Sequence, residues 1–286
     1  MALNPDAVGK TGPPVERTWI DRDVMLYALG VGAGADDPLG PDLALTTENS
    51  KDIGLQVLPT YAILLGQGRI TVDIGEFDPA MLVHGEQEIE LHAPLPVTGT
   101  VRTTMRVAGM YDKGKAAVVA LEVTAVDADA DKPLFTSRMS LFIRGVGGFG
   151  DDRGDPARPP QEIPEREPDA VVTYTTRHDQ ALLYRLSGDR NPLHSDPAFA
   201  ARAGFDRPIL HGLCTYGYTG RALLAARCDG DPSRFGSMAG RFSRPVFPGD
   251  ALTVKVWDLD DGAAAFRTEN QAGDIVLDRG RFTPAR

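Results

Sequence analysis

The sequence predicts an α+β protein made of two similar halves, each an antiparallel sheet with one principal helix. Three observations lead to this prediction. A glycine- and proline-rich stretch divides the 286-residue chain near its middle. Strand-like runs follow a turn that contains Pro and Gly on both sides of that stretch, and each side also contains one principal helical segment.

The dividing stretch begins at Gly145. Residues 145–150 are mostly glycine, charged residues follow, and a proline-rich run extends to Pro168. This composition packs neither a helix nor a central strand. We therefore expect residues 146–170 to be a linker between an N-terminal half, 1–145, and a C-terminal half, 171–286.

The strand signals are runs rich in Val, Leu, Phe and Thr between turn residues. They cover residues 101–111, 116–127 and 133–144 in the first half, and 252–258, 263–270 and 275–283 in the second. Helices are expected around 61–66 and from 212 to about 227. Gly217 and Gly220 weaken the second helix by about 1 kcal/mol each relative to alanine, and we expect them to let a sheet pack close to it.

The two halves also share a short pattern. An apolar-apolar-His-Gly step stands at 82–85 and again at 209–212. In both halves a strand, a turn that contains Pro and Gly (96–99 and 248–249) and a further strand come after it. This similarity indicates an internal duplication.

Composition excludes several classes of protein. The net charge of −10 argues against a nucleic-acid partner, which needs a basic face. No apolar run of about 18 residues is present, so no membrane span is expected. Residues 1–10 lack a signal-peptide pattern and are expected to form a loose arm. Two cysteines are too few for a disulfide framework, which favours a cytoplasmic location.

The segment from Tyr184 to Ala200 holds the most informative chemistry. A helix over 180–186 is expected to stop at Ser187-Gly188, and Pro192 then keeps the following residues in a loop. Asp189 and His194 lie five residues apart on that loop, so a carboxylate and an imidazole can converge on one small volume. Asn191 lies between them and can hold a water molecule or orient either partner.

Other interpretations of the same residues remain open from spacing alone. Asp189 and Asn191 can simply cap their own turn. A metal site is conceivable, although its spacing matches no template; its ligands would be Asp189, His194, Asp196 and His211. A serine–histidine–aspartate triad using Ser187 or Ser195 lacks the G-x-S-x-G turn.

Two longer motifs favour one interpretation. Residues 184–194 read Tyr-x-Leu-Ser-Gly-Asp-x-Asn-Pro-Leu-His, and residues 203–212 read Ala-Gly-Phe-Asp-x-Pro-Ile-Leu-His-Gly. Both resemble the signature of MaoC-like (R)-specific enoyl-CoA hydratases. Further similarity at 27–32, 82–87, 112–114 and 140–142 resembles the duplicated form found in peroxisomal multifunctional enzymes. The resemblance runs from about Val24 to the C-terminus.

The resemblance implies a fold and a reaction. The fold is a double hot-dog, in which two antiparallel sheets each wrap around a principal helix and the halves mimic a dimer. The reaction is reversible syn hydration of trans-2-enoyl-CoA to (3R)-3-hydroxyacyl-CoA. Asp189 and His194 would hold and activate the water with help from Asn191, and the backbone N–H of Gly212 would stabilise the thioester oxygen.

The resemblance also implies a binding site for the CoA ester. Its residues would be His84, Gly85, Lys113, Arg190, Pro192, Leu193 and Phe242. Charge alone suggests that Arg241 or Arg244 adds to the phosphate contacts of Lys113. The first half lacks the Asp-x-Asn-x-x-His motif and is expected to be catalytically silent, shaping the acyl pocket.

The remaining expectations concern partners and alternatives. The enzyme is expected to use no metal and no cofactor, since CoA is part of its acyl-CoA thioester substrate. We expect a cytoplasmic homodimer, because the C-terminus has no peroxisomal Ser-Lys-Leu signal and fused hot-dog units often pair further. The alternatives are a hot-dog acyl-CoA thioesterase and a non-catalytic acyl-CoA-binding module.

Overall fold

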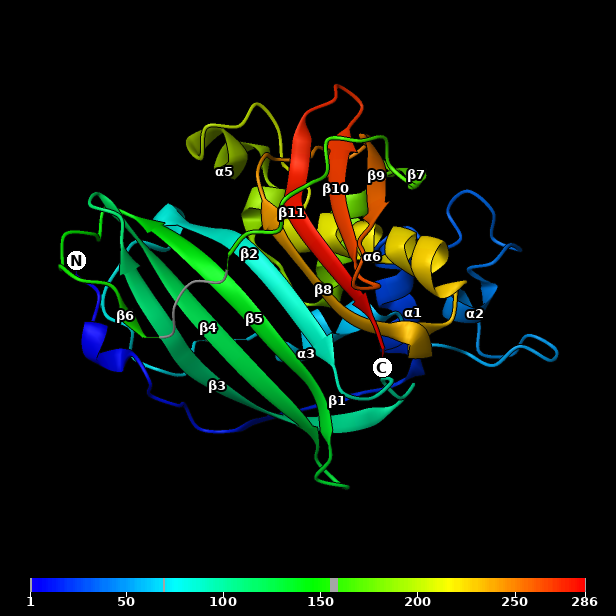
Figure 1. Ribbon diagram of the computed structural model, residues 1–286, viewed down its shortest axis with the longest axis horizontal. Coiled ribbons are helices and arrows are strands. Elements are labelled where there is room, and N and C mark those ends of the chain that lie inside the picture. The colour runs from blue at the N-terminus through cyan, green and yellow to red at the C-terminus, as the bar shows by residue number, and fades with distance from the viewer. Residues whose placement is uncertain (1, 69, 155–158, 286) are drawn as a thin grey trace.

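The computed structural model describes residues 2–68, 70–154 and 159–285. One continuous antiparallel sheet organises them, with strand order β1-β3-β4-β5-β2-β8-β11-β10-β9-β7 and with β6 pairing to β3 (Figure 1). The first half supplies β1 (Val15–Trp19), β2 (Leu82–Leu91), β3 (Gly99–Asp112), β4 (Ala116–Asp127) and β5 (Pro133–Arg144), and the expected linker supplies the two-residue strand β6 (Arg153–Gly154). The second half supplies β7 (Ala170–Thr175), β8 (Phe235–Phe242), β9 (Ala251–Asp258), β10 (Ala264–Asn270) and β11 (Ile275–Pro284).

The helices are mostly short and lie between the strands in sequence. The α-helices are α1 (Asp21–Gly30), α2 (Leu43–Thr46), α3 (Ala62–Gly66), α4 (Gln180–Tyr184), α5 (Pro197–Arg202) and α6 (Gly212–Cys228). Single 3₁₀ turns are η1 (Pro5–Ala7), η2 (Pro59–Tyr61), η3 (Pro79–Met81), η4 (Arg185–Ser187), η5 (Pro192–His194) and η6 (Pro232–Arg234). Within the described part of the chain, no helix is long and apolar enough to cross a membrane.

The two halves join edge to edge between β2 and β8. The register places Glu86 opposite Arg241, Glu88 opposite Ala239 and Glu90 opposite Ser237. Antiparallel pairing satisfies the backbone groups that each half would otherwise expose at a free sheet edge. The expected pair of antiparallel sheets is therefore present, and the two are fused into one surface.

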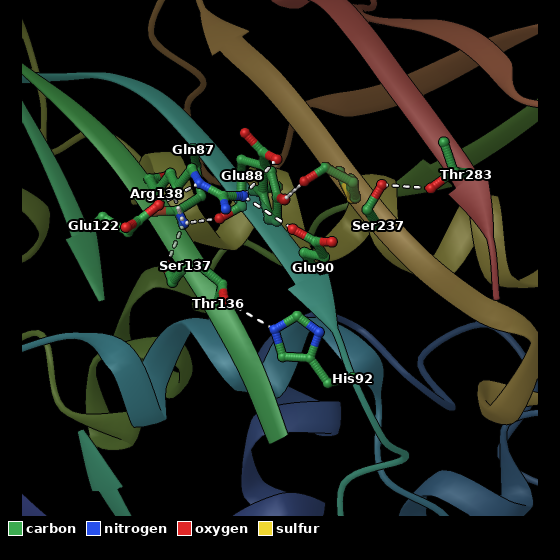
Figure 2. A network of polar contacts seen from close by, with 12 residues as sticks. Gln87, Glu88, Glu90, His92, Glu122, Thr136, Ser137, Arg138, Ser237 and Thr283 are labelled. Atoms are coloured by element: carbon green, nitrogen blue, oxygen red, sulfur yellow. Dashed lines mark hydrogen bonds and ion pairs between the residues drawn. The ribbon is translucent and has the colours of Figure 1, made fainter. Parts of the chain in front are cut away.

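Alternating side chains fix which face of the sheet is buried. In β4, Ala117, Val119, Leu121 and Val123 are buried, while Thr124 is exposed. Figure 2 shows a polar network on the neighbouring strands, where the guanidinium of Arg138 in β5 bonds to carboxylates of β2 and β4. These partners are Glu88, Glu90 and Glu122. The network ties three adjacent strands together beside the junction of the halves.

The long helix α6 lies in the core and is buried over most of its length. A Cβ on Gly217 would stand 2.4 Å from Val31, and one on Gly220 would stand 2.4 Å from Thr60. Both neighbours belong to the first half, near the end of α1 and in η2. The expectation that a sheet packs against these glycines was wrong, because they accommodate segments of the other half.

The first half has a much shorter central helix, α3, of five residues. The N-terminal segment and residues near Ile74 cover the part of the sheet that α3 leaves open. Leu3 and Ala7 are buried there, and the N–H of Asn4 donates to the carbonyl of Ile74 at 2.9 Å. The expectation of a loose N-terminal arm was therefore wrong for the described residues from 2 onward.

The expected linker begins in contact with the first half. Asp112 accepts hydrogen bonds from the N–H groups of Gly148 at 3.0 Å and Gly150 at 2.8 Å. Farther along, the indole of Trp257 donates to the carbonyl of Arg166 at 2.7 Å. Residues 155–158 of this linker lie outside the described residues. The division at 146–170 stays a prediction.

Candidate active site

A proline-bent loop carries the predicted acid–base pair. The helix α4 passes into η4, and Gly188 then adopts a φ of 136°, a conformation that favours glycine. The chain turns there and presents Asp189. Pro192 opens η5, which ends at His194. Short ordered turns therefore hold both Asp189 and His194.

Asp189 and Asn191 do cap their own turn. The N–H of Asn191 donates to Oδ1 of Asp189 at 3.1 Å, and the N–H of Leu193 donates to Oδ1 of Asn191 at 3.0 Å. Each side chain uses one oxygen in this way. The second carboxylate oxygen of Asp189 and the amide nitrogen of Asn191 have no partner among the described residues. Asp189 and Asn191 can therefore cap the turn and still offer a polar atom to a water molecule or a substrate.

His194 is a buried imidazole with a defined protonation pattern. Its Nδ1 lies 2.9 Å from the carbonyl of Ile209, and a carbonyl can only accept, so Nδ1 carries the proton. Nε2 then keeps a free lone pair. Burial lowers the pKa of His194 from its ordinary value, while the nearby charge of Asp189 opposes this shift. His194 is therefore a neutral base near neutral pH.

His211 joins this pair, although the sequence indicated it only as a possible metal ligand. One polar atom from each of Asp189, His194 and His211 lies within 4.8 Å of the others. The rings of His194 and His211 stack with centroids 3.7 Å apart at an angle of 28°. The sequence signal for His211 was the Ile-Leu-His-Gly step, but the contact of its ring with His194 depends on the folded chain.

The geometry fits acid–base chemistry better than a metal site. A metal ion sits about 2.1 Å from a ligating nitrogen, along its in-plane lone pair, whereas stacked rings direct their lone pairs side by side. Asp196, the fourth ligand considered, instead caps α5 by accepting from Phe199 at 2.9 Å. In the described chain, neither Ser187 nor Ser195 shares a hydrogen bond with a histidine.

Gly212 begins α6 with an exposed backbone N–H. No acceptor for this N–H is found among the described residues, as expected for the first turn of a helix. The helix has 17 residues, so its positive dipole end adds to the attraction for a negative oxygen. A Cβ at position 212 would stand 3.3 Å from the ring of Phe242, the last residue of β8.

His84 and Gly85 reach the same region from the first half. The ring of His84 meets the ring of Phe242 edge-on, with centroids 5.2 Å apart. Gly85 forms a bulge in β2, because the register with β5 shifts between His84 and Glu86. This step lies inside a strand and not at a helix start. The expected equivalence of the two His-Gly steps was therefore wrong.

Of the other predicted binding residues, Arg190, Pro192 and Leu193 lie on the acid–base loop itself, and Lys113 lies farther away. Lys113 follows Asp112 at the turn after β3, three strand spacings, or about 14 Å, from Leu82 in β2. Arg190 and Pro192 are exposed and Leu193 is half-buried. Arg244 is engaged with Asp274 at 2.7 Å, which weakens the suggestion that it contacts phosphate.

Comparisons with known proteins cover nearly the whole chain. Residues 18–145 match the MFE-2 hydratase 2 N-terminal domain, and residues 160–279 match the MaoC-like domain. The chain is 48% identical to 3-hydroxyacyl-thioester dehydratase Y of Mycobacterium tuberculosis, covering 98% of both chains. It is 40% identical to a probable enoyl-CoA hydratase 2 of Dictyostelium discoideum, covering 93% of this chain and 91% of the relative.

Solved structures agree with the fold. A MaoC-like dehydratase from Phytophthora capsici matches with a TM-score of 0.89 and 32% identity, covering 99% of this chain and 98% of the other. A Mycobacterium tuberculosis protein described as a double hotdog fold matches with a TM-score of 0.59 and 16% identity, covering 97% and 96%. The predicted double hot-dog architecture is confirmed.

Proposed function

Because the chain belongs to the MaoC-like hydratase 2 family, whose members are hydro-lyases, we propose that Asp189 and His194 are its acid–base pair. The reaction is reversible hydration of trans-2-enoyl-CoA to (3R)-3-hydroxyacyl-CoA in fatty-acid metabolism. One observation carries the assignment of residues. A carboxylate oxygen, a neutral imidazole with a free Nε2 and an unpaired helix N–H belong to segments that meet at one place.

The chemistry follows from these three groups. A water molecule held by Asp189 and His194, with Asn191 assisting, adds its oxygen to C3 of the enoyl group. One O–H bond of the water breaks, and one proton reaches C2 on the same face. Charge builds on the thioester oxygen during the attack, and the N–H of Gly212 stabilises it. A donor of this kind is worth about 3–4 kcal/mol in the barrier.

Substrate binding is shared between the halves. We assign the CoA ester to His84, Gly85, Lys113, Arg190, Pro192, Leu193 and Phe242. The first half, 1–145, is catalytically silent and shapes the acyl pocket, and 171–286 carries the chemistry. The Asp-x-Asn-x-x-His motif occurs only in the second half, which supports this division.

The same three groups also bear on whether the enzyme needs a cofactor. The reaction needs only acid–base groups and an oxyanion donor, so we propose that it uses no cofactor beyond the CoA of its acyl thioester. Neither nucleic acid nor membrane has a part in it. We propose a homodimer in the cytoplasm; the two buried cysteines, Cys214 and Cys228, are unpaired, which agrees with a reducing compartment.

One assay tests the reaction class. Purified enzyme is given trans-2-enoyl-CoA and, in a separate reaction, saturated acyl-CoA, and enoyl absorbance and free thiol are followed in both. The proposal expects enoyl absorbance to fall without release of CoA, and the product to be the (3R) alcohol. Release of free CoA from saturated acyl-CoA would instead identify a thioesterase. Binding with neither change would identify a non-catalytic acyl-CoA-binding module.

A further inference from the structure

His211 is held in a buried slot between the acid–base loop and the first half. His211 is 1% exposed, and it is the residue that immediately precedes α6. One face of its ring stacks on His194 at 3.7 Å, and Tyr184 lies 4.9 Å away at an angle of 50°. Tyr184 in turn contacts Tyr27 of α1, with centroids 6.2 Å apart. A continuous set of rings thus links the first half to His194.

The hydrogen bond of His211 reaches the other member of the pair. Its Nε2 lies 3.1 Å from the backbone carbonyl of Asp189. Because a carbonyl only accepts, Nε2 must carry the proton. The buried Nδ1 has no hydrogen-bond partner among the described residues. His211 therefore holds the backbone of Asp189 by a directional bond and the ring of His194 by a face-to-face contact.

The surroundings of His211 keep it neutral. Burial lowers the pKa of His211 to about 4, and the adjacent His194 and Arg185 act in the same direction, while Asp189 opposes them. A neutral ring can stack on His194 without repelling the proton that His194 takes up during the reaction. A protonated ring at 3.7 Å would oppose that uptake.

We propose that His211 is a positioning residue, which sets the orientation of the His194 ring and the place of Asp189 without touching the substrate. This inference rests on the function proposed above. The first half supplies no reacting group, but α1 helps to hold His211 in place through Tyr27 and Tyr184. Misplacement of a catalytic group by about 1 Å can cost about a hundredfold in rate. A small shift of Asp189 or His194 is therefore enough to lower the rate of hydration.

Two substitutions separate the two contacts. His211→Phe keeps a ring in the slot but removes the donor, whereas His211→Gln keeps a donor near the Nε2 position but removes the ring. Both are expected to lower kcat about tenfold to a hundredfold with KM changed less than about twofold. Unchanged kcat in both variants, or a loss confined to KM, would overturn the proposal. His92→Gln is the control, because His92 bonds to Thr136 away from the site and should leave kcat unchanged.

A second measurement does not depend on activity. The chain has five histidines, so nitrogen NMR signals of the side chains can be assigned by single substitutions, with His194→Gln identifying His194. The wild type and His92→Gln are expected to show His194 in one tautomer, protonated at Nδ1. His211→Gln should show a mixture of both tautomers. An unchanged His194 signal in that variant would overturn the proposal even if turnover fell.

The kinetic and NMR measurements distinguish failure of the proposed function from failure of the proposal for His211. If the wild type does not hydrate any enoyl-CoA, the proposed function fails, while the NMR signals still decide whether His211 orients His194. Thermal unfolding midpoints identify a variant that has lost its fold. His211→Phe preserves a bulky ring in the buried slot and serves as the folded comparison if His211→Gln is unstable.

Discussion

Gly212 lies against the ring of Phe242, so closely that a Cβ at position 212 would stand 3.3 Å from it. The N–H of this glycine opens α6 and has no acceptor within the described chain. His211 precedes it with φ −60° and ψ 134°, a conformation that a following proline also accepts. Position 212 is thus one where the N–H can be deleted without breaking the helix.

Gly212→Pro is therefore predicted to remove the proposed oxyanion donor, although it also adds the carbons of the proline ring. Relative to Gly212→Ala, which adds the same Cβ but keeps the N–H, kcat should fall about a hundredfold to a thousandfold. Steady-state hydration kinetics of the two variants provide the comparison. Equal rates for proline and alanine would show that the backbone N–H does not stabilise the transition state.

The pH profile reports on His194. Burial lowers its pKa below the ordinary value of 6.5, and only its neutral form can accept a proton. Activity should therefore persist as the pH falls through 6.5 and should decline only at lower pH, once His194 becomes protonated. The acid limb of kcat/KM measures this, because it reports ionisations of the free enzyme. An acid midpoint above 6.5 would contradict a buried neutral base.

Gly217 offers a test of how the halves pack. Helix propensity alone predicts that Gly217→Ala stabilises the protein by about 1 kcal/mol. The contact with Val31, only 2.4 Å from the added Cβ, predicts instead that the substitution destabilises the protein. We expect the free energy of unfolding to fall by about 1–3 kcal/mol, as overpacking of a core commonly does.

Chemical denaturation measures the effect of Gly217→Ala. Ala225→Gly, at an exposed position of the same helix, isolates the propensity contribution and should cost about 1 kcal/mol. A more stable Gly217→Ala variant would mean that α6 and the end of α1 are not in close contact in solution.

Local patterns were enough to predict six of the strands and the long helix α6. The bounds of β4 and β5 were predicted to the residue, because alternating apolar residues between turns specify a strand directly. The start of α6 at Gly212 was also predicted correctly. These elements depend on near neighbours in sequence, so the sequence alone contains their signal.

Long-range contacts were not predictable in the same way. The equivalence of His84 and His211 failed because the same dipeptide can sit in a strand bulge or before a helix, depending on what packs around it. The stacking of His211 on His194 joins segments 17 residues apart through the folded core. The resemblance named Asp189 and His194, and spacing offered His211 beside them only as a possible metal ligand; the fold revealed its ring contact with His194 and its hydrogen bond to Asp189.

The central claim is that Asp189 and His194 perform the hydration of an enoyl-CoA thioester. Its most direct test is the rate of hydration of trans-2-enoyl-CoA by the wild type, Asp189→Asn and His194→Gln, each with and without a metal chelator. The account predicts (3R) product from the wild type, near-complete loss in both variants and no effect of chelator. Turnover that survives both substitutions, or that chelator abolishes, would contradict it.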